Sequence, residues 1–283
     1  MQLYVDSDPF LYLRPFPQNS DNLFISHWHE ILFFVFFFHG LFLLGSKVNS
    51  FIFGSWYDNL EQTNAKLKKD FDVRFVGICQ AILSVWFCIP MFFHPKFKND
   101  PVLGEYPFAS FVASFTIGYF IWDLIYCCIF HFELYGIEFL FHAGGALFVF
   151  GSTLVPFFQP YLCSFLIYEL STPFVQYHFM LSNSPDNCPA FLGKHKKTAV
   201  IANGACLILT FFSSRIIWGV FATLYSMYIV WPVKDQYNYL FLIIVYVLNC
   251  GFQFLNFTWF SKMIRLGSKL AAGNTTKRSK KNE

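Results

Sequence analysis

The chain has 283 residues and a net charge of +3, with 55% hydrophobic, 22% aromatic and only 13% charged residues. A soluble globular protein would carry about 25% charged residues, and a soluble core could not hide 41 phenylalanines without exposing large apolar patches. The composition therefore excludes a soluble globular domain and predicts an all-α membrane protein with several spans.

The N-terminal segment MQLYVDSDPFLYLRPFPQNSDN has no positive region followed by an apolar stretch. It therefore does not have the pattern of a cleaved signal peptide. We expect the first apolar segment, residues 28–50, to act as an uncleaved signal anchor.

A membrane-spanning helix needs about 20 mostly apolar residues. By that measure the sequence predicts seven spans, at residues 28–50, 74–93, 109–130, 136–157, 161–181, 199–222 and 238–260. Pro173 lies inside the fifth span, where it predicts a kink. Residues 221–230 extend the sixth span beyond the length of one upright helix, so we expect them to be tilted, re-entrant or interfacial.

Basic residues predict the orientation in the membrane. Of the 20 Lys and Arg residues, 15 lie on the side that holds the loops 51–73, 131–135 and 182–198 and the C-terminal tail. The opposite side holds only Arg14, Lys96, Lys98 and Lys234. Because cytosolic loops are enriched in Lys and Arg, we expect a cytosolic C-terminus and a lumenal N-terminus.

The chain ends in KKNE, with Lys280 and Lys281 at the fourth and third positions from the end. This spacing matches the dilysine signal, which a receptor reads to return membrane proteins to the endoplasmic reticulum. The alternative is an ordinary basic tail. We expect a multi-pass protein of the endoplasmic reticulum membrane.

The eight cysteines show neither the spacing of zinc ligands nor that of a disulfide framework. Most of them lie within apolar segments, where helix packing accounts for them. We expect no metal site, no cofactor and no nucleic-acid partner.

Polar residues inside predicted spans are candidate functional groups, because burying a charge at bilayer depth costs at least about 2.5–3.5 kcal/mol. Glu138 and His142 are four residues apart and share one helix face, and a polar stripe runs along the fifth span. The candidates for the lining of a lipid cavity are Asp123, Glu138, His142, Glu169, Thr172, Gln176 and Arg215.

Two interpretations of these residues stay open. They form a buried scaffold in which Arg215 pairs with Glu169 or Asp123, or they line a cavity for a lipid head group or an acyl carbonyl. The small residues Ala-Gly-Gly at 143–145 leave space after His142 that a neighbouring helix or a ligand could fill.

Several segments together resemble the TLC-domain family, which includes the ceramide synthases. In chain order they are KKDFDVRFVG, NDPVLGEYP, GYFIWDLIY, FLFHAGGAL, YELSTPFVQYHFML, FFSSRIIWG and LNFTWFSKMIR. The resemblance covers residues 68–267 and implies six helices around a membrane cavity. It divides the chain into an N-terminal segment with one extra helix (1–67), the TLC domain (68–267) and a basic tail (268–283).

In ceramide synthases, a His-His pair and downstream acids transfer an acyl chain from acyl-CoA. The resemblance places His142 at the first position of that pair, but Ala143 stands at the second. Glu169 occupies one acidic position and Pro173 replaces the other. A catalytic imidazole needs a partner that orients it and tunes its basicity. This departure argues against ceramide synthase activity.

The sequence therefore favours a role in membrane lipid homeostasis through binding of a lipid or acyl chain, with no firm catalytic residue. One alternative is an acyltransferase-like enzyme that uses His142 with Glu138, Glu169 or Arg215. Another is a factor associated with the translocon or with trafficking, for which the sequence names no protein partner.

Overall fold

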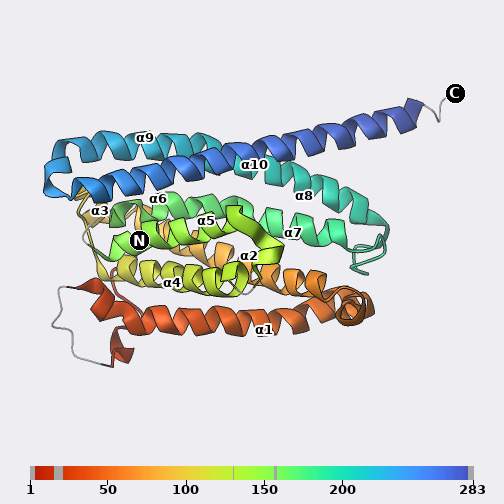
Figure 1. The fold of residues 1–283 in the computed structure, drawn as a ribbon, viewed down its shortest axis with the longest axis horizontal. Helices are drawn as coiled ribbons and strands as arrows, with labels where there is room; N and C mark the ends of the chain where they lie inside the picture. The colour runs from red at the N-terminus through yellow and green to blue at the C-terminus, as the bar shows by residue number, and fades with distance from the viewer. Residues whose placement is uncertain (1–3, 16–21, 130, 156–157, 280–283) are drawn as a thin grey trace.

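The computed structural model describes residues 4–15, 22–129, 131–155 and 158–279, which form helices and connecting turns (Figure 1). The longer helices lie side by side, with α1 at one side of the bundle and α9 and α10 at the other. The α-helices in this part of the chain are α1 (Leu23–Thr63), α2 (Ala65–Phe92), α3 (Pro95–Asn99), α4 (Pro107–Asp123), α5 (Phe132–Gly151), α6 (Leu162–Leu166), α7 (Thr172–Asn183), α8 (Lys196–Phe211), α9 (Trp218–Val230) and α10 (Tyr239–Ser279).

Six helical runs among the described residues are long and apolar enough to cross a membrane. They are Leu23–Thr63, Ala65–Phe92, Pro107–Cys127, Tyr135–Leu154, Gly193–Gln236 and Tyr239–Ser268. The predicted all-α fold with several membrane spans is thereby confirmed.

The predicted fifth span, residues 161–181, is not one long helix. It is divided into α6, the 3-10 segment η5 (Ile167–Ser171) and α7. Pro173 lies in the first turn of α7, where a helix has no hydrogen bond for a proline to break. The kink predicted inside a single helix is therefore a boundary between two helices, and η5 carries Glu169.

The sixth predicted span continues further than expected. Helix α8, the π-helical segment η7 (Phe212–Ile217) and α9 follow one another without a break. Residues 221–230 belong to α9, and their Ala222, Thr223 and Ser226 are buried against the bundle. This segment thus continues the helix of the sixth span, and the π turn within the run carries Arg215.

Two glycines bend helices where other residues would be strained. Gly54 in α1 has φ 60° and Gly136 in α5 has φ 72°, and glycine adopts such positive values without steric cost. The bend at Gly136 separates the first turn of α5 from the part that carries His142.

Helix α1 packs closely on α4 through an aromatic core. Phe34 and Phe38 of α1 meet Phe115 of α4, with ring centroids 5.1 and 5.3 Å apart. Gly118 of α4 allows this approach, because a Cβ there would lie 2.5 Å from the Cβ of Phe34. The first helix therefore forms part of the same bundle as the later ones.

Candidate functional site

A cavity of about 360 Å³ lies among α2, α4, α5, α7 and α10 and the segments η5 and η7. Its wall contains apolar side chains such as Val73, Phe139, Val175 and Phe211. Six of the seven polar residues predicted from the sequence also line it: Asp123, His142, Glu169, Thr172, Gln176 and Arg215.

Glu138 is the predicted residue that the cavity wall does not include. Its carboxylate is half-exposed and accepts hydrogen bonds from Trp259 Nε1 at 3.2 Å and Lys262 Nζ at 3.4 Å. The Trp259 ring also lies against the His142 ring, with centroids 5.9 Å apart. Glu138 and His142 therefore share a helix face, as their spacing predicts, but Trp259 lies between Glu138 and the cavity.

Arg215 is buried and held by neutral oxygen atoms. Its Nε donates to the carbonyl of Tyr168 at 3.1 Å and to the Ser171 hydroxyl at 3.0 Å, and one Nη donates to the Thr172 hydroxyl at 3.0 Å. No carboxylate oxygen among the described residues lies within ion-pair distance of it, so the pairing with Glu169 or Asp123 in the scaffold interpretation is not seen there. The positive charge of the guanidinium is left facing the cavity.

His142 lines the cavity and is surrounded by aromatic rings. Its ring centroid is 6.0 Å from that of Phe120 and 5.8 Å from that of Phe252. None of the residues that the structure describes forms a hydrogen bond with its imidazole. The same side chain borders a smaller hollow of about 50 Å³, which Asn249 and Asn256 also line.

The small residues that follow His142 are used mainly for packing. Ala143 is fully buried in the central aromatic core, so no room is left at that position for a second imidazole. A Cβ on Gly145 would lie 2.8 Å from Cζ of Phe252, whereas one on Gly144 would meet nothing within 4 Å. The space at Gly145 is therefore filled by α10.

Sequence reasoning singled out Gln176 but not the polar network that it forms with other residues of the cavity wall. Arg74 donates to Gln176 Oε1 at 2.6 Å and its Nε lies 3.3 Å from a carboxylate oxygen of Asp70. Tyr135 donates its hydroxyl proton to Asp70 at 3.2 Å, and the Arg74 guanidinium lies 3.4 Å from the ring centroid of Phe179. The sequence did contain one indication of this network, because the four-residue spacing of Asp70 and Arg74 places both side chains on one face of a helix.

The cavity wall combines charged, polar and apolar side chains. Asp123, Glu169 and Arg215 present polar atoms to a space whose other walls are apolar. The site offers charge, shape and apolar surface for binding.

Comparisons with known proteins agree with this architecture. The TLC domain family model matches residues 70–265. A protein of Saccharomyces cerevisiae called Topoisomerase I damage affected protein 4 is 35% identical over 94% of this chain and 92% of its own length. TLC domain-containing protein 4-B of Danio rerio is 28% identical over 72% of this chain and 76% of its own length. No solved structure matches the chain significantly. The match over most of its length, at the residues that surround the cavity, means that the chain belongs to the TLC-domain family.

Proposed function

We propose that this protein binds a membrane lipid or an acyl chain in the cavity and thereby acts in membrane lipid homeostasis. The observation that carries the proposal is the cavity itself. Its volume of about 360 Å³ falls within the range of roughly 300–1,000 Å³ that is usual for small-molecule sites. Its wall combines apolar side chains with Asp123, Glu169 and Arg215, and such a surface matches a molecule with a polar group and a hydrocarbon chain.

The acyltransferase alternative has less support. Catalysis by His142 would require a partner that orients the imidazole. Glu138 is engaged with Trp259 and Lys262 instead, and Ala143 occupies the position of a second histidine. The alternative of a translocon or trafficking factor rests on the family resemblance alone.

We further propose a location in the endoplasmic reticulum membrane, with the C-terminus and the part of the cavity lined by Arg74 and Lys262 on the cytosolic side. Arg74 and Lys262 belong to the side with most of the Lys and Arg residues. The dilysine positions Lys280 and Lys281 lie outside the described residues.

Lipid bound to the purified protein tests the main proposal. The full chain is extracted in a mild detergent, purified, and its retained lipids are quantified by mass spectrometry per mole of protein. Val175 lines the cavity, so Val175→Trp should fill it and reduce the retained lipid severalfold. Val247 is 64% exposed on α10, so Val247→Trp is the matched control and should retain as much lipid as the unchanged protein. Equal lipid content in both variants would contradict the proposal.

A further inference from the structure

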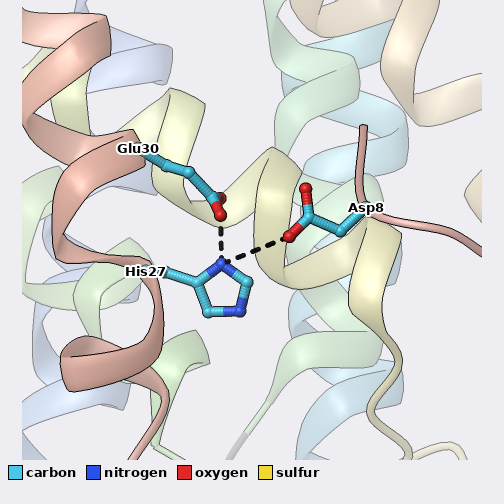
Figure 2. Close-up of side chains that lie close together, drawn as sticks. All are labelled: Asp8, His27 and Glu30. Atoms are coloured by element: carbon cyan, nitrogen blue, oxygen red, sulfur yellow. Dashed lines mark hydrogen bonds and ion pairs between the residues drawn. The ribbon is translucent and has the colours of Figure 1, made fainter. Parts of the chain in front are cut away.

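A group of ionisable side chains is buried at the start of α1, outside the segment that matches the family model. Asp8 in the N-terminal segment is 2% exposed, and His27 and Glu30 of α1 are 1% and 0% exposed. Figure 2 shows that both carboxylates point toward the same ring nitrogen of His27. The function proposed above uses none of these residues.

The three side chains have the spacing of a metal site. Nδ1 of His27 lies 2.9 Å from Oε2 of Glu30 and 4.0 Å from Oδ2 of Asp8, and one ligand atom from each residue lies within 4.8 Å of the others. Metal–ligand bonds of about 2.0–2.1 Å in tetrahedral geometry place ligand atoms roughly 3.3 Å apart. The two observed separations, 2.9 and 4.0 Å, lie on either side of that value. Small side-chain movements would therefore bring the ligand atoms to the distances that a metal ion requires.

Two buried polar atoms without hydrogen-bond partners also point to a cation site. Oε1 of Glu30 is fully buried and has no hydrogen-bond donor among the described residues. Nε2 of His29 lies 3.5 Å from that oxygen and is likewise without a hydrogen-bond partner in this part of the chain. Burying a carboxylate oxygen without a partner is costly, and a cation at this point would satisfy it. His29 is not among the three residues whose ligand atoms lie within 4.8 Å of one another, so it would have to move toward the ion to serve as a fourth ligand.

Charge within the group favours the same conclusion. Two buried carboxylates face a single guanidinium, that of Arg14, whose Nη2 lies 2.7 Å from Oδ2 of Asp8. Nε of Arg14 is 3.9 Å from Glu30, so the nearest fixed positive charge does not reach Oε1 with a hydrogen bond. The carboxylates of the group therefore outnumber its arginines.

We propose that Asp8, His27 and Glu30, with His29 as the fourth ligand, bind a divalent transition-metal ion of the Zn²⁺ class. Imidazole and carboxylate groups are usual ligands of such ions. The ion joins the N-terminal segment to the first turns of α1. When the metal occupies Nδ1, the proton of the imidazole lies on Nε2, which is 3.4 Å from Nη2 of Arg14. Binding therefore moves the guanidinium away from His27, and Arg14 opposes the metal by its charge.

Metal content of the full chain tests the proposal. The protein carries an affinity tag without histidines, is incubated with Zn²⁺, Mn²⁺, Fe²⁺ or Co²⁺ separately, is desalted, and is analysed by inductively coupled plasma mass spectrometry. We expect about one ion per chain. Loss of an outer-shell partner weakens metal sites roughly 10- to 100-fold, so Glu30→Gln, which removes a ligand, should weaken binding at least as much. His39 is exposed on the same helix, and His39→Gln should bind as the unchanged protein does.

Two outcomes overturn the proposal. One is the absence of bound metal from the unchanged protein under all four conditions. The other is equal binding by Glu30→Gln and the unchanged protein, which would place an adventitious ion elsewhere. If Glu30→Gln does not fold, Asp8→Asn takes its place, and X-ray absorption of the unchanged protein should show only nitrogen and oxygen ligands, with imidazole among them. Sulfur in the ligand shell contradicts the assignment.

The variant Arg14→Met distinguishes two explanations of this group: a metal site, and a cluster whose negative charge is neutralised by Arg14 without a metal. In the metal site, removing the guanidinium lowers the positive charge near the ion, so the variant should bind Zn²⁺ as tightly as the unchanged protein or more tightly. In a cluster balanced by Arg14 alone, the variant should bind no Zn²⁺, and its thermal unfolding temperature should fall and stay low when Zn²⁺ is added. That second result contradicts the proposal.

Discussion

Nε of Arg215 donates a hydrogen bond to the Ser171 hydroxyl at 3.0 Å. This contact joins the π-helical turn η7 to the 3-10 segment η5, two irregular stretches that face each other beside the cavity. Each irregular stretch places its backbone and hydroxyl oxygens where a regular α-helix would not. The guanidinium is thus satisfied without a carboxylate.

Arg215→Lys should destabilise the fold although it keeps the charge. A lysine cannot reproduce the forked contacts with Tyr168, Ser171 and Thr172, and hydrogen bonds to charged groups contribute about 1.5–3 kcal/mol. We expect the free energy of unfolding in detergent to fall by about that amount. Arg265 is exposed on α10, so Arg265→Lys should change it by less than about 0.5 kcal/mol. Equal stability of the two variants would show that the contacts of Arg215 contribute little.

Ala143→His should not restore a functional histidine pair. The Ala143 side chain is fully buried in the core, and overpacking of a core costs about 1–3 kcal/mol. We therefore expect a lower thermal unfolding temperature and no transfer of an acyl group from acyl-CoA to amine or alcohol acceptors. Gly144→Ala, one residue later, has open space for its Cβ and should keep or raise the stability, by up to about 1 kcal/mol. Acyl transfer by Ala143→His would instead favour the enzyme alternative.

Gly118→Ala should loosen the contact between α1 and α4. The added Cβ would lie 2.5 Å from the Cβ of Phe34 and 2.9 Å from the backbone oxygen of Ile31, and neither atom can move without the helix. A loss of about 1–3 kcal/mol is expected, measured by thermal or denaturant unfolding. Gly40 of α1 has nothing within 4 Å of an added Cβ, so Gly40→Ala is the control that should not be destabilised. An intact stability in Gly118→Ala would mean that the two helices are not closely packed.

The proposed orientation predicts where glycans can be attached. The sequon Asn274-Thr275-Thr276 should stay unmodified when the chain is expressed in a eukaryotic cell, because glycosylation occurs in the lumen. A sequon added ahead of Met1 through a short flexible linker should be modified. The electrophoretic shift after treatment with a glycosidase measures both. A glycan at Asn274 would reverse the orientation.

Six of the seven residues selected from the sequence line one cavity, and there is a simple physical reason for this. Charged groups inside a span must avoid lipid, so Asp123, Glu169 and Arg215 are expected to face the interior of the bundle. Their partners could not be predicted, because the partners of Arg215 are a backbone carbonyl and two hydroxyls whose positions depend on η5 and η7. Helical spacing placed Glu138 on the face of His142 but could not show that Trp259, from a distant helix, would separate it from the cavity.

Other features were missed because they depend on residues far apart in sequence. The group around His27 was not recognised, since Asp8 lies in a short N-terminal segment without helical periodicity. The fifth span was predicted as one helix because its hydropathy is continuous, whereas the structure divides it at η5. Hydropathy does not record where hydrogen bonding changes from α to 3-10.

Buried hydrogen bonds between α1 and α2 have a consequence for the design of shortened proteins. Asp72 lies within the family match, yet its carboxylate accepts from Asn49 Nδ2 at 2.9 Å and from the hydroxyl of Tyr57, both on α1. A shortened chain that begins at residue 68 would keep this acid and lose both donors. It would also expose the aromatic face of α4 that packs on α1. The smallest piece able to fold independently therefore begins ahead of the family domain, within the preceding helix.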